Sequence, residues 1–444
     1  MGRRENISKK NSYELSDSQV DTPIEIVKLF WSIVKTYRKE KINNVIDFGS
    51  ADCRFSQSEH FNYYLGVELD KSRIIIPHDE RVEVVNKCAF EVGYNGFDAC
   101  IGNPPYVRHH DLEGIWKDST ARWLQKKLDY KINQHCNLFA YFIALGILKT
   151  NSNGLIAQIV PYEWVSRPSY KSLRDLIIGH KWQVDVYCFT YPIFEKVMTT
   201  ACLTVIDKSK TNGEWNYFNI DQNNDIFIRD GVCDSGLKIL DYVKSDETFL
   251  TVRRGISPGS QKIFTLTESE RERHKLLRSD VIPCVTSLKH LPYELEVLDE
   301  ENFIKHFVKA NKRCWLIKSN EGLLSPQLEK YLQSIPEVIR SNYTCSNQFP
   351  WYNFEKYRIG DILIASAFKS NGPKVLDNLY GVVSVSSVIS INLDKSFDKL
   401  ELLSYLKKFN FEQRMVAHSN NLKRLEIRQL IGVINEWMNA NEAS

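Results

Sequence analysis

Short apolar runs alternate with amphipathic segments through the first half of the chain. Ile24, Val27 and Val34 recur at helical spacing after Thr22-Pro23 and predict an amphipathic helix over residues 21–39. Apolar runs predict strands at residues 44–48, 64–70, 82–85, 99–101 and 155–160, a helix at 137–148, and a last pair of strands at 184–189 and 201–206. Because strands alternate with helices, we expect an α/β fold with a mostly parallel sheet covered on both faces.

This alternation stops in a polar, turn-rich stretch at residues 221–236, where we place a domain boundary. The predicted organisation is a polar N-terminal segment at 1–20, a first domain at 21–225 and a second domain at 226–444. In the second domain we expect strands at 361–368 and 380–393 and helical segments near 325–340 and 400–437. This pattern favours an irregular α+β domain.

Composition narrows the class of protein but not its function. The 444 residues are 43% hydrophobic and 25% charged, as in ordinary globular proteins. The chain has no run of about 18 apolar residues and no secretory signal, so we expect a cytoplasmic protein without a membrane partner. Ten scattered cysteines form no Cys-x-x-Cys pair, which favours buried free thiols over disulfides or a metal site. A formal charge of +3 neither requires nor excludes nucleic acid.

One short stretch carries most of the chemical information. The apolar run Ala99-Cys100-Ile101 ends abruptly in Gly102-Asn103-Pro104-Pro105-Tyr106. Two consecutive prolines remove two backbone donors and fix two φ angles, so neither a strand nor a helix continues through them. The Asn103 amide and the Tyr106 ring are therefore expected on a stiff loop at the carboxyl end of a strand, which is where ligands bind in open α/β sheets.

These residue types suit methyl transfer to a nitrogen atom. An exocyclic amine such as adenine N6 is a poor nucleophile because its lone pair is delocalised into the ring. Acceptors for both of its hydrogens, here the Asn103 side-chain oxygen and the Pro104 carbonyl, favour a more tetrahedral nitrogen, and Tyr106 can stack on the base. The alternative is that Asn-Pro-Pro is a turn without a chemical role.

Several separate stretches resemble, in order, the motifs of the TaqI-like, gamma-class adenine-specific DNA methyltransferases. Asn103-Pro104-Pro105-Tyr106 resembles motif IV. The other resemblances are Thr22-Pro23 with motif X, Asp47 to Phe55 with motif I, Gly66 to Asp70 with motif II, Asn137-Leu138-Phe139 with motif V, Val160 to Trp164 with motif VI, and Phe194 and Thr199-Thr200-Ala201 with motif VIII. The resemblance covers about residues 20–210 and implies a Rossmann-like, S-adenosylmethionine-dependent domain from a bacterium or archaeon.

The resemblance also assigns roles to single residues. The S-adenosylmethionine site would include Thr22, Asp47, Gly49, Phe55, Glu68, Phe90 and Asn103. Glu68 would accept the ribose hydroxyls, as strand-end acids do in dinucleotide folds. The catalytic residues would be Asn103, Pro104, Tyr106 and Phe194, with the two aromatic rings on either side of a flipped base. The structural alternatives are a solvated strand-end acid at Glu68, core packing at Phe194, a helix start at Thr22-Pro23 and a helix N-cap at Asn137.

Two motifs depart from the family pattern. Ala51, Asp52 and Cys53 stand where motif I usually carries glycines, and we expect a Cβ there to crowd the cofactor or to shift the loop. Motif III usually has an acid before an aromatic residue, whereas this chain has Ala89-Phe90, so the hydrogen bond to the cofactor's adenine is absent or comes from elsewhere. These departures leave open a non-catalytic DNA-binding or assembly protein on a degenerate methyltransferase fold.

The second half of the chain bears on the substrate. Residues 253–259 resemble the loop that opens the target-recognition domain of TaqI-like enzymes, and residues 360–365 and 380–384 resemble its later half. Arg253 and Arg254 are expected to contact DNA. We therefore expect double-stranded DNA as the substrate, adenine N6 as the acceptor and a cognate restriction endonuclease as a functional partner in a type II restriction-modification system. Cytosine N4, RNA or a protein glutamine are the alternative acceptors.

Overall fold

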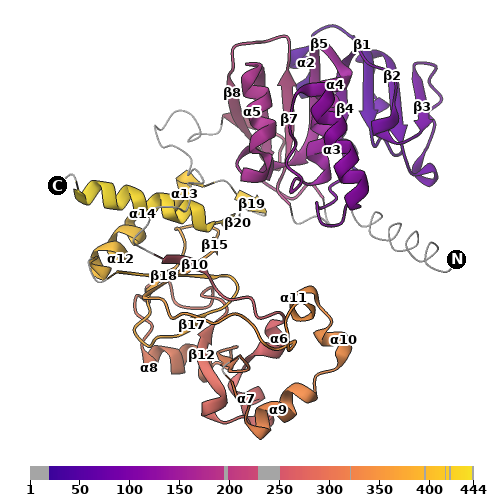
Figure 1. The fold of residues 1–444 in the computed structure, drawn as a ribbon. Coiled ribbons are helices and arrows are strands. Elements are labelled where there is room, and N and C mark those ends of the chain that lie inside the picture. The colour runs from indigo at the N-terminus through magenta and orange to yellow at the C-terminus, as the bar shows by residue number, and fades with distance from the viewer. Residues whose placement is uncertain are drawn as a thin grey trace, which may run out of the picture. The chain divides into compact units, whose positions relative to one another are not determined.

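The computed structural model of the chain describes residues 20–194, 199–228, 251–320, 322–394, 397–415, 417–419 and 422–442. The chain divides into two compact units. The first comprises Met1–Leu237 with Val416–Asn421, and the second comprises Lys238–Met415 with Leu422–Ser444. Each unit has its own sheet structure and hydrophobic core (Figure 1).

The first unit is built around a nine-stranded sheet with the order β3-β2-β1-β4-β5-β7-β6-β8-β9. Its strands are β1 (Ile42–Phe48), β2 (Phe61–Glu68), β3 (Val82–Asn86), β4 (Phe97–Gly102), β5 (Thr150–Pro161), β6 (Gln183–Phe189), β7 (Ala201–Asp207), β8 (Trp215–Ile220) and β9 (Ile226–Ile228). Strands β1 to β5 are parallel, β7 lies antiparallel between β5 and β6, and β9 is antiparallel to β8. The carboxyl ends of β1 to β4 therefore meet at one edge.

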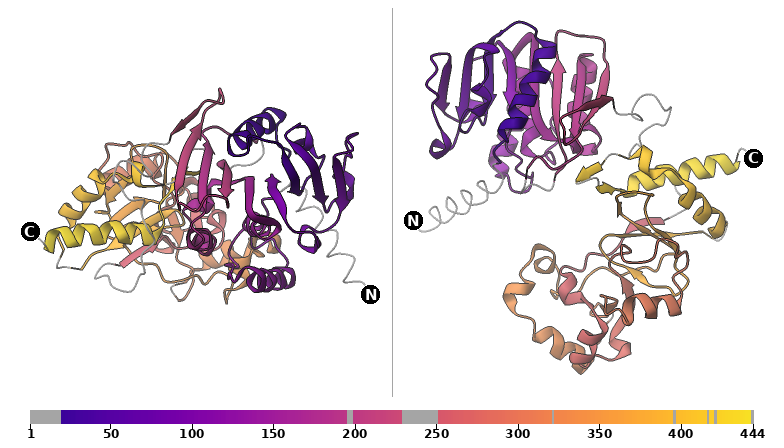
Figure 2. Two further views of the ribbon diagram at one scale, coloured as in Figure 1. Left: turned by 90° about the horizontal axis from the view of Figure 1, so that it is seen from above. Right: turned by 180° about the vertical axis from the view of Figure 1, so that it is seen from behind.

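Helices cover both faces of this sheet, which confirms the predicted α/β fold. They are α2 (Ile24–Tyr37), α3 (Gly114–Leu128), α4 (Leu138–Lys149) and α5 (Lys171–Gly179), with the short helices η1 (Arg54–Ser56), η2 (Lys71–Arg73), η3 (Ala89–Glu91), η4 (Tyr162–Val165) and η5 (Pro168–Tyr170). Helix α2 lies on one face, and α3, α4 and α5 lie on the other (Figure 1, Figure 2). Helix α4 is apolar nearly all round and almost wholly buried, as expected of a helix inside a domain.

Most predicted elements of the first unit are present, but its last strands and two helices differ from the prediction. The strands predicted at residues 184–189 and 201–206 are present as β6 and β7, but the prediction that they are the last strands is wrong, because β8 and β9 extend the sheet beyond β6. The residues of β8 are mostly half-buried and polar residues interrupt them, so no apolar run marks this strand. Strand β9 lies beyond the predicted domain end at residue 225. Helices α3 and α5 were not predicted.

The second unit contains two four-stranded sheets, with the orders β10-β18-β14-β16 and β11-β13-β12-β17, and an antiparallel pairing of β15 with β20. Its strands are β10 (Thr251–Arg254), β11 (Thr265–Leu266), β12 (Val281–Val285), β13 (Trp315–Ile317), β14 (Ile362–Ala365), β15 (Ala367–Phe368), β16 (Val375–Asp377), β17 (Val383–Ser384), β18 (Val388–Asn392) and β20 (Leu422–Arg424). Its helices are α6 (Gln261–Phe264), α7 (Glu268–Arg273), η6 (Arg278–Asp280), α8 (Glu300–Phe303), η7 (Ile304–Val308), α9 (Pro326–Gln333), α10 (Glu337–Arg340), α11 (Tyr343–Ser346), α12 (Lys399–Lys408), α13 (Phe411–Arg414) and α14 (Ile427–Glu442).

The predicted helical segment at residues 400–437 is wrong in its middle part. Helices α12, α13 and α14 are present, but β20 and the short strand β19 (Ala417–Ser419), which belongs to the first unit, interrupt them. Asn410, a turn-favouring residue, lies between α12 and α13. The predicted strand at 380–393 is likewise divided into β17 and β18, because Ser386 between them has a φ of 55°.

The structure bears on two further features of the sequence, membrane-spanning helices and cysteine thiols. None of the helices in the described part of the chain has both the length and the hydropathy of a membrane span. The cysteines that the structure describes are free thiols; Cys53, Cys100 and Cys202 are buried, whereas Cys88 is half-buried.

Candidate active site

A cavity of about 600 Å³ lies at the carboxyl ends of β1 to β4. The loops after these four strands form its wall, together with Val20 to Thr22 and the starts of α3 and α4. The predicted site residues that line it are Thr22, Gly49, Phe55, Glu68, Phe90, Asn103, Pro104 and Tyr106. Its volume is within the range of small-molecule sites. Two further residues predicted for the site, Asp47 and Phe194, are described by the structure but do not line this cavity.

Asn103 follows β4 directly, and its side-chain amide has a defined orientation. Gly102 before it has a φ of 122°, and a Cβ on Gly102 would lie 2.0 Å from the Asp47 Oδ1 atom. The Asn103 Nδ2 group donates to the Val20 carbonyl (3.2 Å) and to the Thr22 Oγ1 atom (3.1 Å). Its Oδ1 atom is buried and finds no hydrogen-bond partner within the described part of the chain. A buried acceptor without a donor lowers the stability of the fold by about 1–3 kcal/mol. An unpaired acceptor of this kind is expected where a ligand supplies the donor.

Tyr106 and Phe194, the predicted pair of stacking rings, are in contact with each other. The Tyr106 hydroxyl donates to the Ile159 carbonyl (3.0 Å), and burial raises the pKa of its phenol well above the usual value. The ring centroids of Tyr106 and Phe194 are 6.1 Å apart, and the rings meet edge to face. Phe194 is only 4% exposed. A base can therefore enter between these rings only if they separate.

The loop after β1 has the backbone conformation that glycines favour, although it lacks the glycines of the family pattern. The φ angles are 78° at Gly49, 47° at Ala51 and 58° at Cys53. Left-handed backbone is uncommon for residues other than glycine. Cys53 is buried, and the absence of a side chain at Gly66 makes room for it, since a Cβ on Gly66 would lie 3.1 Å from the Cys53 Sγ atom. The Ala51 and Cys53 side chains are therefore accommodated in a glycine-like loop.

Glu68 is the last residue of β2 and connects this loop to the end of its own strand. Its Oε2 atom accepts the N–H of Ala51 (3.0 Å), and its Oε1 atom accepts the N–H of Asp70 (2.8 Å). Because a carboxylate has about four acceptor positions, both oxygens can accept further donors from a ligand. The neighbouring Asp70 carboxylate accepts instead from the backbone and hydroxyl of Ser72. Glu68 is thus both a cavity residue and a support of the loop.

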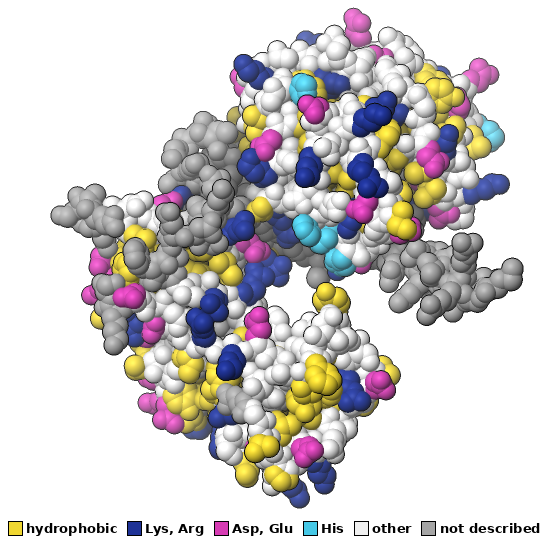
Figure 3. Space-filling view, viewed as in Figure 1, with side chains coloured by type: hydrophobic (Ala, Val, Ile, Leu, Met, Phe, Trp, Pro, Cys, Tyr) yellow, Lys and Arg dark blue, Asp and Glu magenta, His cyan; other side chains and the backbone are white. Residues whose placement is uncertain are grey.

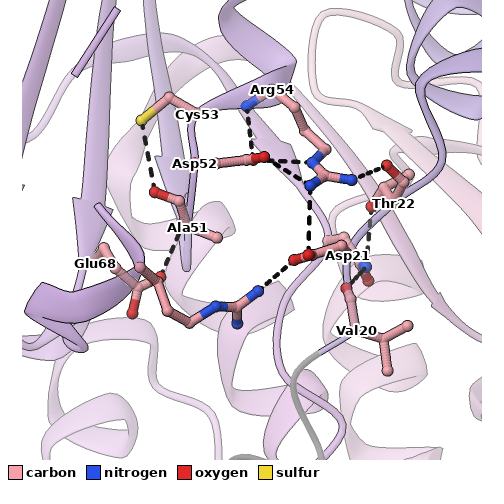
Figure 4. A network of polar contacts seen from close by, with 10 residues as sticks. Val20, Asp21, Thr22, Ala51, Asp52, Cys53, Arg54 and Glu68 are labelled. Atoms are coloured by element: carbon pink, nitrogen blue, oxygen red, sulfur yellow. Dashed lines mark hydrogen bonds and ion pairs between the residues drawn. The ribbon is translucent and has the colours of Figure 1, made fainter. Parts of the chain in front are cut away.

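Charged groups tie residues 20–22 to the cavity wall (Figure 4). The Arg54 guanidinium pairs with Asp52 at 2.6 Å, lies 3.4 Å from the Asp21 carboxylate, and donates to the carbonyl of Thr22. Arg73 pairs with Asp21 as well. Burial alone would raise the pKa of the Asp52 carboxyl, but the hydrogen bonds and charge of Arg54 lower it. The segment before α2 is therefore held by a network of ionised groups.

Aromatic side chains form another part of the wall. The Phe90 ring meets Trp116 edge to face with centroids 5.3 Å apart, and it meets Phe142 at the same centroid distance. Trp116 and Phe142 line the cavity, yet the sequence analysis did not identify them. Trp116 lies on α3, a helix with a weak amphipathic pattern that escaped detection. The acids Asp111 and Glu113 also line the cavity, whereas Ala89, which lines it too, has no side-chain acceptor.

Asp47, in β1, is buried next to the cavity but does not line it. It is 1% exposed, and its Oδ2 atom accepts a hydrogen bond from the Tyr64 hydroxyl (2.5 Å). Burial raises the pKa of this carboxyl to about 7, although the Tyr64 hydrogen bond acts in the opposite direction.

The Asn137 side chain connects the start of α4 to two other segments of the first unit. It precedes α4, but among the described residues its side chain makes no capping hydrogen bond to that helix. Its Oδ1 atom accepts the N–H of His109 (3.1 Å), and its Nδ2 group donates to Glu163 (3.1 Å). The alternative of an ordinary N-cap therefore holds for its position but not for its side chain. Asn137 joins the loop after Tyr106 to the segment that follows β5.

Arg253 and Arg254, the predicted DNA contacts, lie on β10 of the second unit. Both are exposed, but the Arg254 guanidinium pairs with Glu426 at 2.6 Å. Figure 3 shows lysine and arginine side chains scattered over the visible faces of both units, interspersed with acidic ones. The formal charge of +3 is consistent with this mixture.

Both units match known families. Residues 24–194 match the family model described as Eco57I restriction-modification methylase, and residues 235–410 match that of the C-terminal domain of the type II methyltransferase M.Eco57I. The chain is 22% identical over 378 residues to the type II methyltransferase M.AccI of Acinetobacter calcoaceticus, an alignment that covers 76% of this chain and 68% of that protein. It is 26% identical over 227 residues to M.HincII of Haemophilus influenzae, covering 49% of this chain and 43% of that protein.

Solved structures agree at the level of the fold. A nuclease-deletion mutant of the type ISP restriction-modification enzyme LlaGI, in complex with a DNA substrate mimic, aligns with a TM-score of 0.50 and 11% identity, over 93% of this chain and 54% of that one. The first unit has a Rossmann-like α/β sheet, and the same unit carries the match to the restriction-modification methylase model. Through both of its units, the chain is related to the restriction-modification DNA methyltransferases, whose cofactor is S-adenosylmethionine.

Proposed function

We propose that the chain is a site-specific adenine-N6 DNA methyltransferase of the TaqI-like gamma class and the modification component of a type II restriction-modification system. The observation that carries this proposal is the Asn103 Oδ1 atom, a buried acceptor that lacks a partner among the described residues and belongs to the wall of the cavity. Pro104 and Tyr106 follow it on the same wall. The similarity to M.AccI and the order of the motifs support the proposal.

The residues of the cavity fit S-adenosylmethionine. The Glu68 oxygens have capacity for the ribose hydroxyls, and the wall formed by Phe90 and Trp116 suits a purine ring. Val20 to Thr22 would enclose the methionine end, as their resemblance to motif X implies. When bound, this cofactor supplies an electrophilic methyl group on a sulfonium centre. Asp111 and Glu113 are acids near this wall that can replace the acceptor missing at Ala89.

The protein's part in the reaction is to position and polarise the target amine. The Asn103 Oδ1 atom and the Pro104 carbonyl accept hydrogen bonds from its two N–H groups, and these bonds localise the nitrogen lone pair. Tyr106 stacks on the base, and its ring is oriented by the hydrogen bond to Ile159. No covalent intermediate with the protein is required, so the rate depends on placement and on preorganised dipoles. The base has to leave the duplex to reach this site.

Two alternatives are less well supported. Cytosine-N4 enzymes have a closely similar loop, usually with Ser or Asp in place of Asn103, which favours adenine. A non-catalytic protein was suggested by the altered motif I, but Ala51 and Cys53 adopt the backbone that glycines favour. The second unit's match to the C-terminal domain of M.Eco57I favours DNA over RNA or a protein glutamine.

A single experiment tests the acceptor and the mechanism. The wild-type gene is expressed in a host without adenine methylation, and its DNA is sequenced with modification-sensitive reads. We expect N6-methyladenine in one sequence motif, and we expect Asn103→Ala to lower the methylation rate at least about 100-fold with S-adenosylmethionine binding retained. Asn43→Ala, at an exposed asparagine of β1, is the control and should methylate normally. Methylated cytosine, or an active Asn103→Ala variant, would contradict the proposal.

A further inference from the structure

We propose that Thr22 is a positioning residue for Asn103, acting with the Val20 carbonyl to fix which way the Asn103 amide faces. This inference rests on the proposed function, in which the Asn103 oxygen accepts from the target amine. It goes beyond the role in the cofactor site that the motif resemblance assigns to Thr22.

Orientation matters because the two ends of a carboxamide have similar shapes and opposite hydrogen-bonding properties. With Oδ1 toward the target, Asn103 accepts a hydrogen bond from the amine and helps to localise the lone pair of its nitrogen. With Nδ2 toward the target, two donors would face each other and the amine would be repelled. A loop that held Asn103 without selecting between these orientations would spend part of its time in the unproductive one.

The contacts of Asn103 select one orientation. Its Nδ2 group lies 3.2 Å from the Val20 carbonyl, and a backbone carbonyl is only an acceptor. The Thr22 Oγ1 atom accepts the second N–H at 3.1 Å. Rotation of the amide would place Oδ1 against the Val20 carbonyl oxygen, which is unfavourable. These two acceptors leave Oδ1, buried and unbonded to any described residue, as the group available to a substrate.

The acceptors are themselves held in place. Thr22 is 2% exposed, and its carbonyl accepts a hydrogen bond from Arg54. Asp21, between the two acceptor residues, pairs with Arg54 (Figure 4) and also with Arg73. The segment before α2 therefore presents a carbonyl and a hydroxyl to Asn103 at defined positions.

Two substitutions of Thr22 separate this role from a contact with the cofactor. Thr22→Val keeps the shape and removes the hydroxyl, whereas Thr22→Ser keeps the hydroxyl. We expect Thr22→Val to lower the single-turnover methylation rate about 10-fold with the S-adenosylmethionine Kd unchanged, and Thr22→Ser to restore the rate. Thr36→Val, in which the lost hydroxyl bonds the Ile33 carbonyl in α2, is the matched control and should leave the rate unchanged.

A second readout does not depend on activity. In protein labelled with ¹⁵N-asparagine, the Asn103 side-chain NH₂ signal is assigned by its loss in Asn103→Ala. Its hydrogen exchange should be slow in wild type and in Thr22→Ser, and about 10-fold faster in Thr22→Val. A weaker cofactor Kd with unchanged exchange in Thr22→Val would overturn the inference and make Thr22 a cofactor contact only. Slow, Thr22-dependent exchange in a wild-type protein that methylates no DNA would instead contradict the proposed function and leave the orienting contact established.

Discussion

The Tyr106 ring meets the Phe194 ring edge to face, with centroids 6.1 Å apart and an angle of 75° between the planes. Tyr106 is also anchored by its hydrogen bond to the Ile159 carbonyl at 3.0 Å. A phenylalanine side chain has no hydrogen-bonding group, so packing alone determines the position of Phe194. If a base enters between the rings, Phe194 is therefore the ring that we expect to move.

This relationship predicts that both aromatic rings contribute to the methylation rate. Stacking contributes roughly 1–3 kcal/mol per base, so Tyr106→Ala and Phe194→Ala should each slow methylation by roughly 5- to 150-fold while cognate DNA still binds. Tyr106→Phe, which keeps the ring and loses only the bond to Ile159, is the control and should retain most of the rate. The fluorescence of 2-aminopurine at the target position should rise on binding to wild type. A normal rate in Phe194→Ala would make Phe194 a core residue and remove it from the site.

Glu68 is predicted to contribute to cofactor binding more than its neighbour Asp70. Replacing Glu68 with alanine removes a buried carboxylate from the cavity wall, and S-adenosylmethionine binding should weaken by about 1–3 kcal/mol. Asp70→Ala removes an acid that is less buried and whose Oδ1 atom accepts from the backbone and hydroxyl of Ser72, so the Kd should change less than in Glu68→Ala. Isothermal titration of both variants measures the difference. A larger loss in Asp70→Ala would move the ribose site to Asp70.

The parts of the site that the sequence predicts are those specified by local chemistry. Two prolines after an apolar run end β4 whatever surrounds them, so the position of Asn103 at a strand end is readable without a structure. The same holds for Glu68 at the end of β2. Thr22 was expected in the site, but its bond to Asn103 joins residues 81 positions apart and depends on how α2 packs against the sheet.

Other features depend on tertiary contacts that no local pattern encodes. Trp116 enters the wall because α3 packs near α4, and that helix buries little beyond Thr120, Ala121 and Leu124. The left-handed backbone at Ala51 runs against the intrinsic preference of alanine, and the Glu68 carboxylate that bonds its N–H comes from the neighbouring strand. Residue preferences alone therefore predict a different loop.

Ala51 provides a test of this strain. Ala51→Gly removes the steric cost of the left-handed backbone conformation but increases the entropy of the unfolded chain. The two effects oppose each other, so stability should rise by about 0–1 kcal/mol. Ala121→Gly, at a helical position in α3, is the matched control and should lose about 1 kcal/mol. Urea unfolding followed by tryptophan fluorescence compares the two variants. Equal destabilisation by both substitutions would argue against strain at Ala51.

Arg253 and Arg254 are predicted to differ in their contribution to DNA binding. Each phosphate contact adds about 0.9 to the slope of log K against log salt concentration. The Arg254 guanidinium already forms an ion pair with Glu426 in its own unit. Arg253→Ala should therefore lower the magnitude of the slope by the value of about one phosphate contact, and Arg254→Ala should lower it by less. Glu426→Gln releases Arg254 and should strengthen binding at low salt. Fluorescence anisotropy with labelled duplex at several salt concentrations gives all three values, and identical slopes in all variants would exclude both arginines.

Asp47 is predicted to make the stability of the first unit depend on pH. Burial raises the pKa of its carboxyl from 3.8 to about 7, and the charges of Glu68 and Asp52 add to this effect. Because the folded pKa is the higher one, the folded state binds the proton more tightly than the unfolded chain does. The contribution of the protonated carboxyl is therefore fully present below about pH 4 and is lost as the pH rises to about 7.

Asp47→Asn removes this titration and keeps an acceptor for the Tyr64 hydroxyl. The melting temperature of wild type, measured relative to that of Asp47→Asn, should therefore fall between about pH 4 and about pH 7. Tyr64→Phe removes the hydrogen bond that lowers the Asp47 pKa, so in that variant the fall should extend to higher pH. Differential scanning calorimetry across this range measures the three proteins under the same conditions. If wild type and Asp47→Asn share one pH dependence, then Asp47 does not titrate in this range and its carboxyl is ionised while buried behind the cavity.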